Sequence, residues 1–166
     1  LKFPFSSSAL ANNNIVSNNI SQNNSNGIFV WAGNNNRITE NKILNNKNNG
    51  IFVSFADNNY FSLNTVDSNT EYAVYLDDDC SNDTFEKNNF YASSTNPDSI
   101  VNYMLNNNKS LDFVNNYWNT TDSSFVKNKI YGTTDKINYT PFLFSAVDTA
   151  AGADTIAPGA VSITSY

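Results

Sequence analysis

A short motif that returns at a nearly fixed interval constrains the fold of this 166-residue chain more than any other feature. The motif reads apolar, two residues, Asn, one residue, apolar. Its copies are Ile15–Ile20, Ile38–Ile43, Phe61–Val66, Phe85–Phe90 and Phe113–Trp118. The first three copies are spaced by 23 residues, the next by 24 and the last by 28. A period of this length indicates a repeat architecture, in which each unit stacks on the next.

A second motif repeats beside the first, at Gly27–Val30, Gly50–Val53 and Ala73–Leu76. The segments between the two motifs are rich in Asn and Gly, which favour turns and left-handed backbone angles. Helical solenoids need units of about 33–47 residues, and the leucines of a leucine-rich repeat are absent. The sequence therefore predicts an all-β fold, a right-handed parallel β-helix (β-solenoid) of about five coils with a repeat of about 23 residues.

In a parallel β-helix, equivalent residues of successive coils stack about 4.8 Å apart. The motifs thus predict apolar ladders that fill the interior. One ladder is Ile15, Ile38, Phe61, Phe85 and Phe113; a second is Ile20, Ile43, Val66, Phe90 and Trp118; the third side holds Ile28, Ile51 and Val74 with Val30, Val53 and Leu76. The polar positions predict a structural Asn ladder of Asn18, Asn41, Asn64, Asn88 and Asn116. A carboxamide in such a ladder donates to one neighbour and accepts from the other.

Composition excludes several classes of function. With 9 basic against 15 acidic residues and a formal charge of −6, the chain lacks the basic surface that nucleic acids require. Hydrophobic residues make up 40%, too many for a disordered polar tract. No apolar run approaches the ~18–20 residues of a transmembrane helix, so membrane insertion is not expected. Cys80 is the single cysteine, which rules out an intramolecular disulfide.

The Asn-rich coils resemble the NosD-type family of right-handed parallel β-helix proteins, with Gly27–Ile43 and Gly50–Val66 as the closest matches. The segments Asn115–Asp122, Lys129–Tyr131 and Ile137–Leu143 resemble the closing coil of many secreted and cell-surface prokaryotic proteins of this fold, although Asn119 replaces the usual Gly. The resemblance implies an extracellular or cell-surface location. It implies no single activity, since the family includes surface-layer and adhesive proteins, carbohydrate-binding modules and polysaccharide-processing enzymes.

Composition also divides the chain. Residues 1–144 are expected to form the β-helix domain, and residues 145–166 turn to Ala, Thr, Gly, Ser and Pro. That tail is expected to be a linker. Its segment Asp154–Pro158 with Val161–Ile163 resembles the start of an immunoglobulin-like or fibronectin-type module.

An outward strip of aromatic residues is the first candidate site. If Ile28 and Val30 face inward, strand alternation turns Phe29 outward, and Phe52 and Tyr75 stack above it. Exposed aromatic rings on a rigid sheet serve as sugar-stacking platforms or protein contacts. Polysaccharide or cell-surface glycan is therefore an expected partner, and coverage by another segment or subunit is the alternative.

The densest acidic group is the second candidate site. Asp77, Asp78 and Asp79, with Asp83 after one turn, offer the hard oxygen ligands that calcium prefers. The spacing does not fit an EF-hand loop, so solvated turn charges are the alternative reading.

Two functions remain open. The first is a non-catalytic module of a cell-surface, adhesive or self-assembling structural protein, because an open solenoid end exposes strand edges that must be capped or paired. The second is a fragment of a polysaccharide-processing enzyme, a lyase, hydrolase or epimerase. No catalytic motif is present: the cations are scattered, His is absent, and no nucleophile elbow or zinc spacing occurs.

Overall fold

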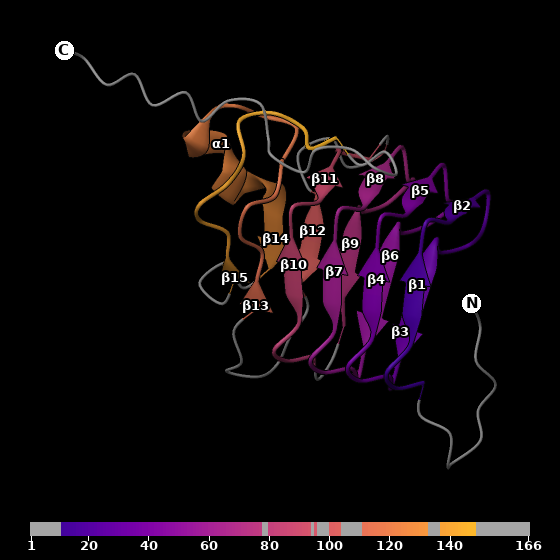
Figure 1. Cartoon of the computed structure of the whole chain (residues 1–166). Coiled ribbons are helices and arrows are strands. Elements are labelled where there is room, and N and C mark those ends of the chain that lie inside the picture. The colour runs from indigo at the N-terminus through magenta and orange to yellow at the C-terminus, as the bar shows by residue number, and fades with distance from the viewer. Residues whose placement is uncertain are drawn as a thin grey trace.

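The computed structural model describes residues 11–77, 80–93, 95, 100–103, 111–132 and 137–148. They form a parallel β-solenoid of three sheets (Figure 1). Sheet A contains β1 (Ile15–Ser17), β4 (Arg37–Thr39), β7 (Tyr60–Ser62), β10 (Thr84–Glu86), β13 (Leu111–Asp112) and β15 (Ile137–Asn138). Sheet B contains β2 (Ile20–Gln22), β5 (Lys42–Leu44), β8 (Thr65–Asp67) and β11 (Asn89–Phe90). Sheet C contains β3 (Ile28–Trp31), β6 (Ile51–Ser54), β9 (Val74–Leu76), β12 (Val101–Tyr103) and β14 (Ile130–Gly132).

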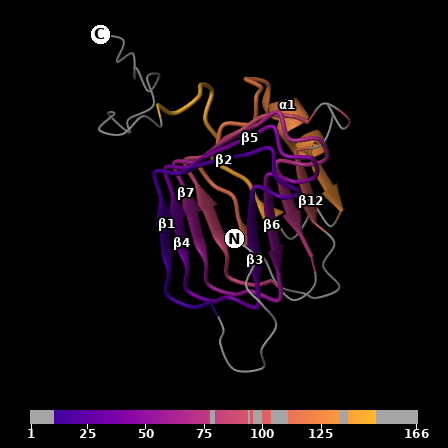
Figure 2. The ribbon, with the colours of Figure 1, turned by 90° about the vertical axis from the view of Figure 1, so that its right-hand side faces the viewer.

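The chain visits sheets A, B and C in turn, so every strand pairs in parallel with its equivalent one turn along. Figure 2, turned toward the end of the solenoid that carries β1 and β3, shows these strands stacked behind one another. Four turns contribute a strand to each sheet. The closing turns are less regular, and in them Tyr117 and Leu143 form isolated bridges beside sheet B. The predicted fold class is confirmed.

Stacked apolar side chains fill the interior from the second turn onward, as predicted. The rings of Phe61 and Phe85 are parallel within 2°, with centroids 4.2 Å apart, and Phe113 stacks on Phe85 at the same centroid distance. Ile43, Val66 and Phe90 lie in register and are fully buried. Face-to-face stacking is imposed here by the coil spacing, which brings equivalent rings to contact distance.

Three ladders line the corners of the described turns, where one ladder had been predicted; in each of them a side-chain oxygen, from an Asn in every case but one, accepts from the turn before. Ladder I precedes sheet A, ladder II lies between sheets A and B, and ladder III follows sheet B. Ladder I is Asn14, Asn36, Asn59 and Asp83; ladder II is Asn19, Asn41, Asn64, Asn88 and Asn116; ladder III is Asn24, Asn46 and Asn69. In each rung the side-chain oxygen accepts the backbone N–H and, in nearly every case, the side-chain amide of the rung before it. Side-chain oxygens thus accept the backbone N–H groups at these corners.

The prediction for the first turn was wrong by one residue. Val16, not Ile15, pairs with Ile38, and Ser21, not Ile20, pairs with Ile43. Ile15 and Ile20 are 73% and 66% exposed. A slip of one residue moves every side chain of a strand to the other face, so both isoleucines point outward.

The same slip displaces the predicted Asn ladder. Asn19, not Asn18, is the first rung of ladder II, because its backbone N–H and Nδ2 both donate to Oδ1 of Asn41. Asn18 instead holds a left-handed backbone with φ 57°. Asparagine is suited to both positions, because it tolerates the positive φ of the first and its amide makes the hydrogen bonds of the second. The register therefore cannot be read from an Asn-Asn pair.

The register shift has a local cause in the second turn. Asn24 donates to Asn46, 22 residues on, whereas Asn49 donates back to Asn26 at a separation of 23. The second turn therefore carries one extra residue after ladder III. Sheet C is unaffected, since Ile28 pairs with Ile51 as predicted.

Gly27 and Gly50 lie immediately before β3 and β6, where the next turn leaves no space for a side chain. A Cβ at Gly50 would lie 2.3 Å from Cγ1 of Val66 and 2.7 Å from the carbonyl oxygen of Ala73. Gly27 meets Ile43 at the same distance. The glycine in the first two copies of the repeat is therefore a packing requirement.

The far end of the solenoid departs from the predicted pattern. The 28-residue interval before the last copy of the motif contains β12, which supplies the fourth strand of sheet C. Helix α1 (Ser123–Val126) and the 3₁₀ helix η1 (Lys127–Lys129) follow, with Asp122 as the α1 N-cap and Val126 buried in the core. No helix in the described part of the chain is both long and apolar enough to cross a membrane.

The start of the predicted linker packs against the β-helix. The backbone N–H of Val147 donates to Oδ1 of Asn89, and its carbonyl accepts from Nδ2 of the same side chain, both at 2.7 Å. Val147 is buried. The rest of the tail, from residue 149, lies outside the described residues, as does the predicted module entrance.

Candidate binding surface

The outer side of sheet C carries the aromatic column that the sequence suggested. Phe29 pairs with Phe52, and Phe52 with Tyr75, in the sheet register. The rings of Phe29 and Phe52 stack with centroids 4.9 Å apart, and Tyr75 meets Phe52 edge-on at 5.0 Å. Each ring is partly buried by its neighbours. The column runs along the solenoid axis at one ring per turn.

Further aromatic residues widen this column. Trp31 contacts Phe29 at 5.8 Å and Phe55 at 5.4 Å between ring centroids, and Tyr72 lies 6.1 Å from Tyr75. Trp31 is 39% exposed and Phe55 46% exposed. We call the connected surface of Phe29, Trp31, Phe52, Phe55, Tyr72 and Tyr75 the aromatic face. Contiguous apolar surface of this kind usually marks an interaction site.

Sequence reasoning missed Trp31 and Phe55, although a signal for both was present. Trp31 ends β3 two residues after Phe29, so strand alternation places it on the same outer side. Phe55 follows β6 with φ 51°, a left-handed angle that few bulky residues adopt. The backbone angle is not readable from sequence, but Trp31 follows from the strand period alone.

The strand residues beneath the aromatic face are uncharged. β3, β6 and β9 read Ile-Phe-Val-Trp, Ile-Phe-Val-Ser and Val-Tyr-Leu. In the sheet register, Asn102 of β12 pairs with Tyr75, and Tyr131 of β14, which is 58% exposed, pairs with Asn102. The surface thus suits an uncharged ligand with apolar faces and edge hydroxyls.

The outer side of sheet A has different chemistry. The guanidinium of Arg37 lies 4.7 Å from the ring centroid of Tyr60, and the Tyr60 hydroxyl donates to Oε2 of Glu86 at 3.0 Å. Partial burial raises the pKa of the Tyr60 hydroxyl. The Tyr60 ring is therefore engaged by a cation and a carboxylate of its own chain.

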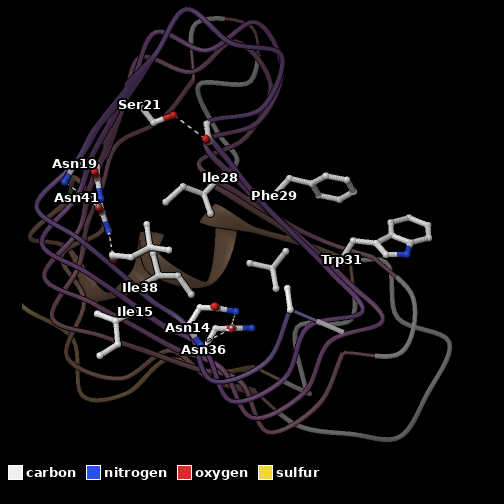
Figure 3. Close-up of a pocket in the computed structure, with 14 residues that line it drawn as sticks. Asn14, Ile15, Asn19, Ser21, Ile28, Phe29, Trp31, Asn36, Ile38 and Asn41 are labelled. Carbon is white, nitrogen blue, oxygen red and sulfur yellow. Dashed lines mark hydrogen bonds between the residues drawn. The ribbon is translucent and has the colours of Figure 1, made fainter. Parts of the chain in front are cut away.

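A hollow opens at the end of the solenoid where β1, β2 and β3 are the last strands of their sheets (Figure 3). Its volume is about 500 Å³ and its lining is mostly apolar, with Val16, Ile28 and Ile38. Phe29 and Trp31 also line the hollow, and Figure 3 shows their rings directed toward the outer side of β3. The aromatic face and the hollow therefore adjoin at β3.

Of the four aspartates of the predicted calcium site, the structure describes Asp77 and Asp83. Asp83 is 1% exposed and forms the last rung of ladder I, where its Oδ1 accepts from the backbone N–H and Nδ2 of Asn59. Asp77 follows β9 and is partly exposed, while Asp78 and Asp79 lie outside the described residues. Across the described ranges, no three His, Cys, Asp or Glu residues are grouped to hold a metal ion. Asp83 therefore occupies the place in ladder I that asparagine takes in the earlier turns.

Cys80 is buried in the same corner. Burial raises the pKa of its thiol to about 12, with smaller contributions from the charges of Asp83, Asp57 and Asp77. The thiolate is the nucleophilic form of cysteine, so Cys80 is an inert packed side chain at neutral pH.

The geometry defines a β-solenoid repeat protein with polar corner ladders and one aromatic outer face. A family model described as a right-handed beta helix region matches residues 4–136, and the chain belongs to that family. The match agrees with the parallel topology and does not distinguish the NosD type within it. Comparison with curated proteins and with solved structures gives no match.

Proposed function

We propose that this chain is a non-catalytic extracellular β-helix module of a cell-surface or adhesive protein, and that its aromatic face binds neutral polysaccharide. The observation that carries the proposal is the connected series of six aromatic rings on sheet C, two of them more than a third exposed. The extracellular location rests on the resemblance to secreted NosD-type proteins.

The spacing of the rings supports a polymeric ligand. Phe29, Phe52 and Tyr75 follow one another at about 5 Å along a rigid sheet. A chain of pyranose rings laid along the solenoid axis would meet successive aromatic rings without any rearrangement of the sheet. A preformed surface of this kind avoids the entropy of ordering side chains on binding.

Charge favours a neutral polymer over an acidic one. The strands under the aromatic face carry no charge, and the chain has a formal charge of −6. A uronic-acid polymer would be repelled at long range without gaining an ion pair on the face.

Affinity electrophoresis through gels containing glucan, mannan, xylan or a uronic-acid polymer tests the proposal. We expect at least one neutral polymer to retard the wild-type chain, and Trp31→Ala with Phe52→Ala to abolish the retardation. Tyr60→Ala on sheet A is the matched control, because it removes an aromatic ring from a different face. Retardation unaffected by the sheet C variants would contradict the proposal.

The enzyme alternative is examined in the same samples. Incubation with each polymer should produce no new reducing ends and no unsaturated sugar, with or without calcium. Product formation by the wild-type chain would replace the binding module with a polysaccharide-processing enzyme. Self-association through the aromatic face would instead appear as dimers in light scattering that Trp31→Ala converts to monomers.

A further inference from the structure

Ladder I contains a change of residue type that the repeat does not require. Its rungs read Asn14, Asn36, Asn59 and then Asp83, at separations of 22, 23 and 24 residues. Asp83 makes the accepting half of a normal rung: its Oδ1 receives the backbone N–H of Asn59 at 2.7 Å and Nδ2 at 3.0 Å. An asparagine in this position would make the same two bonds.

The second side-chain atom of Asp83 distinguishes it from the other rungs. In Asn36 and Asn59 that atom is Nδ2, which donates to the next rung at 3.0 Å. In Asp83 it is Oδ2, which is buried and has no hydrogen-bond partner. Because Thr84 pairs with Asp112, the next turn places Leu111 at the rung position, and Leu111 is itself buried. An ionised Oδ2 would therefore be a buried charge without a donor, and the next rung position is held by an apolar residue.

We propose that protonation of Asp83 controls whether the corner before β10 stays closed. The neutral acid occupies a rung of ladder I as asparagine does in the earlier turns, and the corner is closed. When Asp83 ionises, the corner can open. The open corner includes Cys80, which is fully buried in the closed state. The protonation state of Asp83 thereby determines how stable the contact between the third and fourth turns is at this corner. This proposal does not depend on the aromatic face.

The surrounding groups favour the neutral acid. Burial raises the pKa of the Asp83 carboxyl to about 7, against the two bonds from Asn59, and the negative charge of Asp57 raises it further. Asp57, one turn back, itself accepts from the Ser81 hydroxyl. Asp77 and Cys80 share the corner, and Asp112, one turn on, is exposed and accepts from Nδ2 of Asn138. No described Lys or Arg contributes to the shift of Asp83.

The sign of the effect follows from proton linkage. The closed corner holds the Asp83 proton up to about pH 7, whereas the open corner releases it near the ordinary aspartate value of about 4. Opening therefore becomes easier as pH rises through this window and levels off above it. The ratio of open to closed corner should rise about a hundredfold between pH 4.5 and 7.5, allowing for partial relaxation.

Reaction of Cys80 with 4,4′-dithiodipyridine measures the opening, because Cys80 is the only thiol in the chain. Rates are divided by those of the urea-unfolded chain at each pH, which removes the titration of the thiol itself. We expect the corrected wild-type rate to rise about a hundredfold over the window. Asp83→Asn should fold, since asparagine occupies the other rungs, and should give a flat profile. Asp57→Asn should keep the rise with its midpoint at lower pH.

Two results would overturn the proposal. One is a corrected rate for Asp83→Asn that rises as steeply as that of the wild-type chain. The other is a wild-type rate that stays flat while a ¹³C NMR titration shows the Asp83 carboxyl ionising near pH 4. Circular dichroism at each pH separates opening of one corner from global unfolding, and a parallel loss of all strand signal would also count against the local device.

Discussion

Ladder I and ladder II run along the same solenoid and are built from the same corner geometry, but they end differently. In ladder II every rung is asparagine, and the last, Asn116, accepts from Asn88 and donates to the carbonyl oxygen of Phe85 at 2.7 Å. Ladder I ends at Asp83, whose Oδ2 has no partner. One ladder closes its hydrogen bonds, and the other leaves a titratable group in the interior.

The difference shows why asparagine suits a repeated buried corner. Its side chain carries a donor and an acceptor at fixed positions, so each rung satisfies its neighbours without any net charge. A carboxylate supplies the acceptor alone, and the missing donor must come from a bound proton. Ladder II is therefore expected to be indifferent to pH, whereas ladder I is expected to respond to it.

Placing an aspartate in ladder II should have the largest effect. Asn64 is fully buried, and its Nδ2 donates to the carbonyl oxygen of Ile38 and to Oδ1 of Asn88. Asn64→Asp would set a carboxylate oxygen against both acceptors, so we expect urea unfolding to show a loss of roughly 5 kcal/mol at pH 8. The loss should be smaller at pH 5, where the acid can protonate. Equal stability of variant and wild type at pH 8 would show that ladder II tolerates charge.

The reverse substitution in ladder I should stabilise the chain. Because the pKa of Asp83 is raised to about 7, its contribution is fully present below about pH 4 and is lost as pH rises to 7. Asp83→Asn removes that loss, so we expect a gain of about 3 kcal/mol at pH 8 and little change at pH 4. Urea denaturation at both pH values measures the difference. A gain of the same size at pH 4 would point to a cause other than ionisation.

The smallest effects belong to the first turn and test its corrected register. Asn19 is exposed, and Asn19→Ala removes the amide that donates to Asn41 and to the Ser17 carbonyl, so a loss of about 1 kcal/mol is expected. Asn18→Gly should cost nothing, because glycine adopts the φ of 57° more readily than asparagine. If instead Asn18→Gly destabilises and Asn19→Ala does not, the rung is Asn18.

The fold could be predicted from the sequence because the repeat specifies it at several positions at once. Ile38, Phe61 and Phe85 recur with the spacing of the coil, and strand alternation then places Phe29 and Phe52 outside. The first turn could not be placed in the same way, since Ile15 and Val16 are both apolar and Asn18 and Asn19 are identical. The strand pairing shows that the second turn carries one extra residue, and this places Val16 and Asn19 in the ladders instead of Ile15 and Asn18.

The role of Asp83 was hidden for a related reason. Its neighbours Asp77, Asp78 and Asp79 suggest a group of metal ligands when read along the chain. Its partner in space is Asn59, 24 residues earlier, and the Asn14, Asn36 and Asn59 series was visible in the sequence but not recognised. The spacing of the repeat therefore predicts the role of Asp83 better than the number of charged residues beside it in the sequence. The contact between Trp31 and Phe55 was likewise not apparent along the sequence, because the two residues belong to successive turns.

The aromatic face can be tested directly through the fluorescence of Trp31. The chain has two tryptophans, Trp31 at 39% exposure on the aromatic face and Trp118 fully buried in the core. When a neutral oligosaccharide that retards the chain in gels is titrated in, we predict a blue shift and reduced acrylamide quenching that saturate together. Trp31→Phe should remove the signal, and Trp118 should contribute none. Saturable binding that leaves Trp31 emission and quenching unchanged would contradict the account.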